Sequence, residues 1–341
     1  MTTTATQQLG RPARPRSTSA AGPVTAYAVL LGLLVVAVAA SVLIGSRLVA
    51  PTALLEAGAD RTVLEVRAVR TVLGVLVGVA LGLAGACMQG LTRNPLADPG
   101  ILGVNSGAAL AIVLGIAYLG VGSMTAYVVL ALVGAALASL AVHAIAGIGR
   151  DGATPAKLTV AGAAFAAAAS SWTVAVQLVD QTTLDVMRRW QVGSIGGRSW
   201  DLVVSLAPVF AAGTVLALVL SRTLNALALG DEMAAGLGRH TTRDRLLVGL
   251  AIVLLAGTAT AAAGPIAFVG LIVPHLVRTR TGSDHRHLLP LSAGYGAVLV
   301  LLADTVGRVV LPPSEVQVGI MTAVVGVPFF LLLVRRGRMG L

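Results

Sequence analysis

The sequence predicts an all-α membrane protein with about ten transmembrane helices, because of its composition and the length of its uncharged runs. Hydrophobic residues make up 56% of the 341 residues, charged residues only 11%, and the mean hydropathy is +0.90. A helix needs about 20 apolar residues to cross a bilayer, and runs of that order recur along the chain. Since the bilayer core offers no water to backbone groups, and no alternating barrel pattern is present, the spans are predicted to be helices.

Five spans follow directly from uncharged apolar runs, which lie at 23–46, 71–92, 158–179, 202–221 and 316–334. The uncharged run 99–149 is about twice one span, and Gly120 and Gly122 predict the break that divides it into two helices. The segment 246–277 is also too long for one span. There, Gly264-Pro265 predicts the end of one helix and the start of a shorter one with proline in its first turn. A last span at 288–303 brings the predicted total to ten.

The predicted organisation is a disordered tail at 1–22, a ten-helix domain at 23–336 and a short tail at 337–341. An even number of spans places both termini on one side. With the N-terminus inside, the inner segments carry twice as many basic residues as the outer ones, which predicts a cell-membrane protein with cytoplasmic termini. The first apolar run is longer than the core of a signal peptide, so we expect a retained helix.

Several classes of function have little support in this sequence. The net charge of +10 is spread over loops with few aromatic residues, so we expect no nucleic-acid partner. The single cysteine, Cys87, excludes an intrachain disulfide and a cysteine metal cluster. The histidines are scattered, and neither HExxH nor GxSxG is present. We therefore predict no catalytic residue, no cofactor and no metal site.

The energy source of a transporter with this sequence is expected to lie on another polypeptide. An ion-coupled carrier usually places ionisable groups inside its spans, and the one candidate acid, Asp304, lies at a helix end near Arg308. A P-loop for ATP requires GxxxxGK[ST], and the sole lysine, Lys157, lies in TPAKLTV without that context. A separate ATPase subunit is the preferred source of energy, and an ion-coupled secondary carrier is the alternative from another class.

The second span carries a small-residue pattern, Gly74, Gly78 and Gly82, which allows another helix to approach its backbone closely. Gln89 lies on nearly the same face, two turns further on. It either borders a polar path or donates a hydrogen bond to a neighbouring helix, and the pattern does not decide between these.

The segment 222–245 is too polar to span a membrane but is well patterned. Short helices are predicted at 223–229 and 231–237, with Gly230 between them, and with Asp231 and Glu232 at the positive end of the second. Met233 and Leu237 share one face of that helix, four residues apart. This face suits either a groove in a partner protein or the lipid surface.

Several stretches, in order along the chain, closely resemble the permease subunits of binding-protein-dependent ABC importers for iron siderophores, haem and vitamin B12. The ferric-enterobactin type is the most similar. The stretches are RTVLGVLVGVALGLAGACMQGLTRNPLADPGILGVNSGA at 70–108, ALGDEMAAGLG at 228–238, GPIAFVGLIVPHLVR at 264–278, ADTVGRVV at 303–310 and VQVGIMTAVVGVPFFLLLVRR at 316–336.

This resemblance implies a type II ABC importer permease fold that moves an iron chelate, a ferric siderophore, inward by alternating access. Haem or vitamin B12 is the alternative substrate. The implied partners are two ATPase subunits, a second permease subunit that is identical or homologous, an extracytoplasmic substrate-binding protein and membrane lipid. The implied roles are a cytoplasmic gate at Asn94, ATPase coupling at Asp231, Glu232, Met233 and Leu237, and docking of the binding protein at Arg67, Arg70 and Arg308.

Local patterns permit simpler roles for some of these residues. Asn94 and Asp98 each precede a proline, so each is expected to cap the start of a helix, with or without a role in gating. Arg67 and Arg70 are three residues apart at the start of the second span, and Arg308 lies at the outer end of the ninth. On pattern alone, these arginines are snorkelling interface residues.

Overall fold

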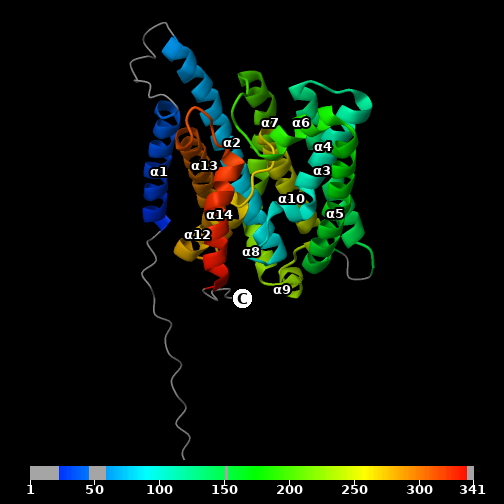
Figure 1. Cartoon of the computed structure of the whole chain (residues 1–341). Helices are drawn as coiled ribbons and strands as arrows, with labels where there is room; N and C mark the ends of the chain where they lie inside the picture. The colour runs from blue at the N-terminus through cyan, green and yellow to red at the C-terminus, as the bar shows by residue number, and fades with distance from the viewer. Residues whose placement is uncertain (1–22, 46–58, 150–152, 336–341) are drawn as a thin grey trace, which may run out of the picture.

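The computed structural model describes residues 23–45, 59–149 and 153–335, and every regular element in these ranges is a helix (Figure 1). In chain order the elements are α1 (Pro23–Leu43), α2 (Ala59–Thr92), the 3₁₀-helix η2 (Pro99–Leu102), α3 (Val104–Leu119), α4 (Met124–Ala146), α5 (Pro155–Val179), α6 (Gln181–Gln191), α7 (Trp200–Val219), α8 (Ser221–Ala228), α9 (Asp231–Gly236), α10 (Thr241–Ile252), the π-helix η3 (Val253–Gly257), α11 (Thr258–Ala263), α12 (Val269–Thr281), α13 (His285–Val310) and α14 (Val318–Arg335). The predicted tails at 1–22 and 337–341 lie outside the described residues.

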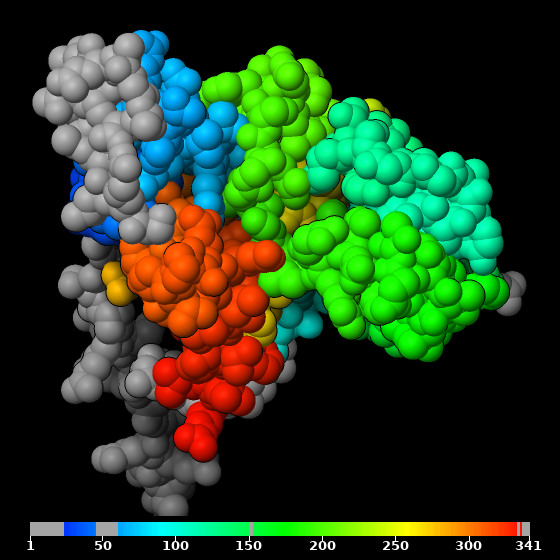
Figure 2. Space-filling view, turned by 45° about the horizontal axis from the view of Figure 1, so that its top comes forward, coloured from blue at the N-terminus to red at the C-terminus, as the bar shows by residue number. Residues whose placement is uncertain are grey.

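The helices form two groups with α2, α7 and α10 between them. One group holds α1, α12, α13 and α14, and the other holds α3, α4, α5 and α6, as Figure 1 shows. The long helix α2 runs through the middle and is mostly buried, whereas α1 lies at the edge and is mostly exposed. Seen obliquely from the end opposite α8 and α9, α14 and α5 stand out on one face with a hollow between them (Figure 2).

The glycine pattern on α2 is a close helix contact, as predicted. A Cβ atom on Gly78 would overlap the backbone of Gly296 and Ala297 in α13, and one on Gly82 would overlap the backbone of Ser292 in the same helix. Glycine at these positions therefore allows α2 and α13 to pack backbone against backbone. Gln89 is buried two turns further on, and its Nε2 donates to the carbonyl oxygens of Gly270 (3.3 Å) and Leu271 (3.2 Å). Of the two predicted roles for Gln89, the interhelical hydrogen bond is the one observed.

The predicted spans correspond one for one to helices, although the count of ten membrane crossings stays a prediction. Among the described residues, seven helical segments are long and apolar enough to cross a membrane: α1, α2, α4, α5, α7, α10 continued through η3 and α11, and α13. The helices α3 and α14 are apolar but shorter, and α12 has 13 residues. Thus the uncharged runs locate the helices. The helix lengths vary more than they would if every helix crossed the bilayer in the same way.

The helix α2 begins at Ala59, twelve residues before the uncharged run 71–92, so Arg67 and Arg70 lie inside it, in accord with their predicted place at the start of the second span. One predicted helix start was wrong. The helix α12 begins at Val269, so Pro265 is not in its first turn. Gly264 does end α11, with φ 77°, but the chain then crosses in non-helical conformation to Phe268, which has φ 69°.

Other predicted breaks agree with the structure. Gly120 has φ 61° and ends α3, and Ser123 caps α4 through the amide of Ala126. Gly230, with φ 101°, separates α8 from α9 within a residue or two of the predicted bounds. The amphipathic helix α6 is an addition to the predicted elements, because its segment is too polar to span a membrane. Asp180 caps it, and its buried residues include Met187 and Trp190.

Candidate functional site

The short helix α9 presents two apolar side chains away from the bundle. Met233 is 63% exposed and Leu237, just after the helix, is 65% exposed, while Ala234 between them is buried. Glu232 is exposed beside them. Large apolar side chains that project from the same short segment form a surface suited to contact with another molecule. We refer to Met233 and Leu237 as the α9 apolar pair.

Asp231 differs from the other predicted coupling residues because its carboxylate is engaged within the chain. Arg245, at the start of α10, donates to both of its oxygens at 2.7 and 2.8 Å, and Arg93, just after α2, donates at 3.3 Å. Asp231 therefore ties α9 to α10 and to the end of α2. Arg93 directly precedes Asn94, so α9 and the predicted gate residue are joined through adjacent residues.

Further contacts fix α8 and the segment after α9 to the bundle. Arg239 donates to both carboxylate oxygens of Asp244 in α10, at 2.8 and 3.0 Å, and to the hydroxyl of Thr223 in α8. Asn225 in α8 donates to Asp284 at 2.6 Å. Hydrogen bonds from the amide of Arg286 and from Asn225 lower the pKa of Asp284 below its ordinary value.

The amide oxygen of Asn225 also accepts from the backbone amide of His285 at 2.9 Å and lies 2.8 Å from its Nδ1. These contacts join α8 to the first residue of α13. With Asp231 and Arg239, they connect the α8–α9 unit to three helices of the bundle. A displacement of this unit would therefore move the ends of α2, α10 and α13.

Asn94 lies exposed in a stiff turn between α2 and η2. Its Oδ1 accepts from the amide of Leu96 at 2.9 Å, and the preceding residue, Arg93, has φ 52°. Asp98 caps η2 by accepting from the amide of Gly100 at 2.8 Å. The expectation that both residues cap helices is right for Asp98 and wrong for Asn94. Asn94 caps a turn, since the helix starts at Pro99 and not at the first proline.

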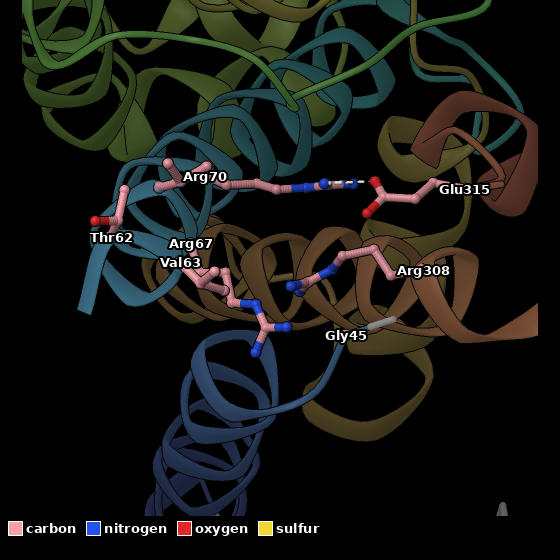
Figure 3. Close-up of a pocket in the computed structure, with 8 residues that line it drawn as sticks. Gly45, Thr62, Val63, Arg67, Arg70, Arg308 and Glu315 are labelled. Carbon is pink, nitrogen blue, oxygen red and sulfur yellow. Dashed lines mark hydrogen bonds and ion pairs between the residues drawn. The ribbon is translucent and has the colours of Figure 1, made fainter. Parts of the chain in front are cut away.

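At the opposite end of the bundle, three arginines line a cavity of about 460 Å³ (Figure 3). Arg70 donates to Asp304 at 2.8 to 3.1 Å through Nε and Nη2, and to Glu315 at 2.7 Å through Nη1. The Nε of Arg308 lies 3.2 Å from Asp304. The Asp304 side chain is 1% exposed, whereas that of Glu315 is 40% exposed. Three guanidinium groups thus face two carboxylates, which leaves the cavity positive.

Arg67 and Arg308 are bound more deeply than exposed docking or snorkelling residues would be. Arg67 is 7% exposed and donates to the carbonyl oxygens of Val42 and Leu43 at the end of α1. Arg308 is 2% exposed and donates to the carbonyl and hydroxyl oxygens of Ser41. Both arginines therefore hold α1 against α2 and α13. Arg70 and Glu315 are the charged pair with access to the cavity, and a docking role for any of these residues stays a prediction.

Several partners in these two regions were not identified from the sequence. Arg245 and Glu315 gave no local signal, since Glu315 lies 245 positions from its partner Arg70. Arg188 and Arg189 project from α6 and are exposed at the same end of the bundle as the arginine-lined cavity. Within the described ranges, no group of three or more His, Cys, Asp or Glu side chains is arranged to hold a metal ion.

The helical bundle, with its apolar spans, defines a polytopic membrane protein. The chain belongs to the FecCD transport family, whose model matches residues 33–336. It is 46% identical over 319 residues to a ferric enterobactin transport system permease protein of Escherichia coli, covering 91% of this chain and 95% of that protein.

A siderophore transport system permease protein of Bacillus subtilis is 44% identical over 273 residues, covering 80% of this chain and 82% of the relative. Among solved structures, a metal-chelate type ABC transporter in an inward-facing conformation matches with a TM-score of 0.82 and 28% identity. That match covers 92% of this chain and 99% of the other. The resemblance found in the sequence motifs is thereby confirmed at the level of family and fold.

Proposed function

We propose that this chain is the permease subunit of an ATP-driven importer that carries a ferric siderophore into the cytoplasm. The observation that carries the proposal is the 46% identity, over nine tenths of the chain, to a ferric enterobactin permease. The α9 apolar pair adds independent support. An exposed apolar surface, joined through Asp231 and Arg93 to the proposed gate residue Asn94, is suited to contact with an ATPase subunit. The permease hydrolyses no ATP, since its sequence contains no P-loop.

The proposed assembly contains two ATPase subunits below α8 and α9, a second permease subunit that is identical or homologous, and an extracytoplasmic binding protein. In this topology α8, α9 and both termini face the cytoplasm of a cell-membrane protein, in accord with the distribution of basic residues. The hollow between α14 and α5 (Figure 2) suits a path completed by the second permease. Both helices expose large apolar side chains, among them Trp172, Leu178 and Val324.

The contacts of Asp231 suggest how ATPase motion reaches the path. Closure of the ATPase would press on the α9 apolar pair and shift α9. Because Asp231 binds Arg245 and Arg93, that shift moves the start of α10 and the residue next to Asn94 together. The stiff turn that contains Asn94 would then open or close as a unit. Alternating access requires such a two-state element.

The proposal is tested by transport in proteoliposomes that contain the full transporter. The binding protein is added on the side opposite the cytoplasmic face. Labelled ferric enterobactin, the substrate named for the Escherichia coli relative, is the first probe. We expect uptake that requires ATP and the binding protein. It should continue when a protonophore has collapsed the proton gradient. Uptake that proceeds without ATP and stops with the protonophore would identify an ion-coupled carrier instead.

The arginine-lined cavity is the proposed docking place for a carboxylate of the binding protein. Arg70 is the accessible arginine, and one of its nitrogens already holds Glu315. An incoming carboxylate would therefore compete with Glu315 for Arg70. Arginine suits this exchange because its planar fork can pair with two carboxylates at once.

Glu315→Gln is accordingly expected to strengthen docking of the binding protein by a factor of roughly 1.4 to 5, the range for one exposed pair of about 0.2 to 1 kcal/mol. The gain should shrink at high salt. Kd measured by surface capture at two salt concentrations checks this. The matched control is Glu65→Gln, which removes an exposed carboxylate paired with Arg61 at the same end of the bundle. Equal affinities of the two variants for the binding protein would show that the cavity is not part of the docking surface.

A further inference from the structure

A second cavity, of about 350 Å³, lies between α1, α12, α13 and α14 on the side of the bundle nearer α8 and α9. We refer to it as the α12–α14 groove. Its floor is buried and apolar, with Ile272 and Val298, and its rim is exposed and apolar, with Leu276 and Val325. A long apolar groove on a membrane protein is suited to a hydrocarbon chain rather than to a polar substrate.

The depth of this groove matches one leaflet of a bilayer. On α13 its lining extends from Leu291 to Leu302, which at 1.5 Å per residue is roughly 16 Å. The hydrocarbon core of a bilayer is about 30 Å thick, so half of it is about 15 Å. The groove thus reaches from the end of the bundle near α8 to about the membrane midplane.

A cation lies at the end of the groove nearer α8 and α9, where a lipid headgroup would be. Arg280, in the last turn of α12, lines the groove and is exposed. In the described parts of the chain it makes no side-chain hydrogen bond or ion pair. The hydroxyl of Tyr295, also in the lining, donates to the carbonyl of Ala26 at 3.4 Å. Arg280 is therefore the lining group available to an anion, and its guanidinium can bind a phosphate through two nitrogens.

From this combination of charge and depth, we infer that the α12–α14 groove binds one anionic phospholipid. An acyl chain fills the apolar channel, and the headgroup phosphate binds Arg280. The inference depends on the proposed topology only for the leaflet, which is the cytoplasmic one, and it is independent of the transported substrate. Anionic lipids are abundant on that side, and each arginine near the surface favours them by about fivefold.

The test uses the full transporter, purified in detergent and exchanged into phosphatidylglycerol or phosphatidylcholine. Retained lipid is counted by native mass spectrometry. Arg280→Gln is expected to lower phosphatidylglycerol retention about fivefold, and to lower phosphatidylcholine retention less, because the choline cation offsets the phosphate charge. The matched control is Arg286→Gln, an exposed arginine at the start of α13 that does not line the groove. Inorganic phosphate at millimolar concentration should not displace the lipid, because the acyl chain supplies most of the contact.

A second variant tests the apolar channel with Arg280 intact. Val325→Trp adds a large side chain at an exposed rim position, so it should fill the groove and reduce retention of the bound lipid while the helices still fold. Equal phosphatidylglycerol retention in Arg280→Gln and its control would overturn the inference. Displacement of the lipid by phosphate alone would also overturn it. So would a Val325→Trp variant that keeps the lipid but loses the second permease subunit, because that result would assign the groove to the contact between the two permeases.

Discussion

Replacement of both Met233 and Leu237 by aspartate is expected to reduce transport to background while the permease stays folded in the membrane. The α9 apolar pair projects away from the bundle, so two carboxylates there disturb no internal packing. They would instead place charges inside the apolar contact proposed with the ATPase, where burial of an unpaired charge is strongly unfavourable. Uptake, permease level and copurification of the ATPase are the three measurements.

The matched control is His240→Asp with Thr242→Asp, which adds two carboxylates to the same polar segment. Both positions are exposed and lie at the start of α10, where negative charge favours the helix. The control should transport normally. If the Met233 and Leu237 variant also transports at the parent rate, the α9 apolar pair rests on lipid and the coupling assignment fails.

Asn94→Trp is expected to block uptake without weakening either assembly or docking of the binding protein. The side chain of Asn94 is exposed at the turn that α9 reaches through Arg93, so added bulk there would obstruct the proposed inner constriction. Loss of the hydrogen bond to Leu96 is a separate effect, worth about 1 kcal/mol.

Two smaller substitutions separate the contribution of bulk from that of capping. Asn94→Ala removes the hydrogen bond without adding volume, and Asn94→Ser retains an oxygen that can cap the turn. If Asn94 lines the path, uptake should fall with Trp and be nearly normal with Ala and Ser. A parallel loss of uptake and protein level in Ala and Trp alike would restrict Asn94 to a structural role.

The spans and the α8–α9 unit could be predicted because their signals are local. Uncharged runs of span length, and Gly230 between two short amphipathic segments, carry the information within a few turns of sequence. The amphipathic helix α6 also had such a signal, since Asp180 caps it and Thr183, Met187 and Trp190 lie on its buried face. Uncharged runs of span length do not reveal this helix, because its segment is polar and amphipathic.

The charge network and the start of α12 could not be predicted, because distant residues determine them. Arg70 binds Asp304, 234 positions away in the sequence, and Glu315, 245 positions away. The residues around each of them contain no pattern that indicates the contact. Similarly, Gly264 packs against the backbone of Trp190. This contact, and not Pro265 alone, determines the direction of the chain after α11. Tertiary packing overrides the local preference for a proline-initiated helix there.

The bonds between Arg70 and Asp304 also bear on the order in which this protein is completed during synthesis. The ribosome makes α2 long before α13, so Arg70 enters the membrane without the carboxylate that it binds in the finished bundle. Asp304 and Arg308, four residues apart on α13, enter together as a pair and so lessen each other's insertion cost. A nascent chain that ends before α13 would keep both the charge of Arg70 and the glycine face of α2 uncovered. Arrival of α13 is thus the step that both neutralises the charge of Arg70 and covers the glycine face of α2.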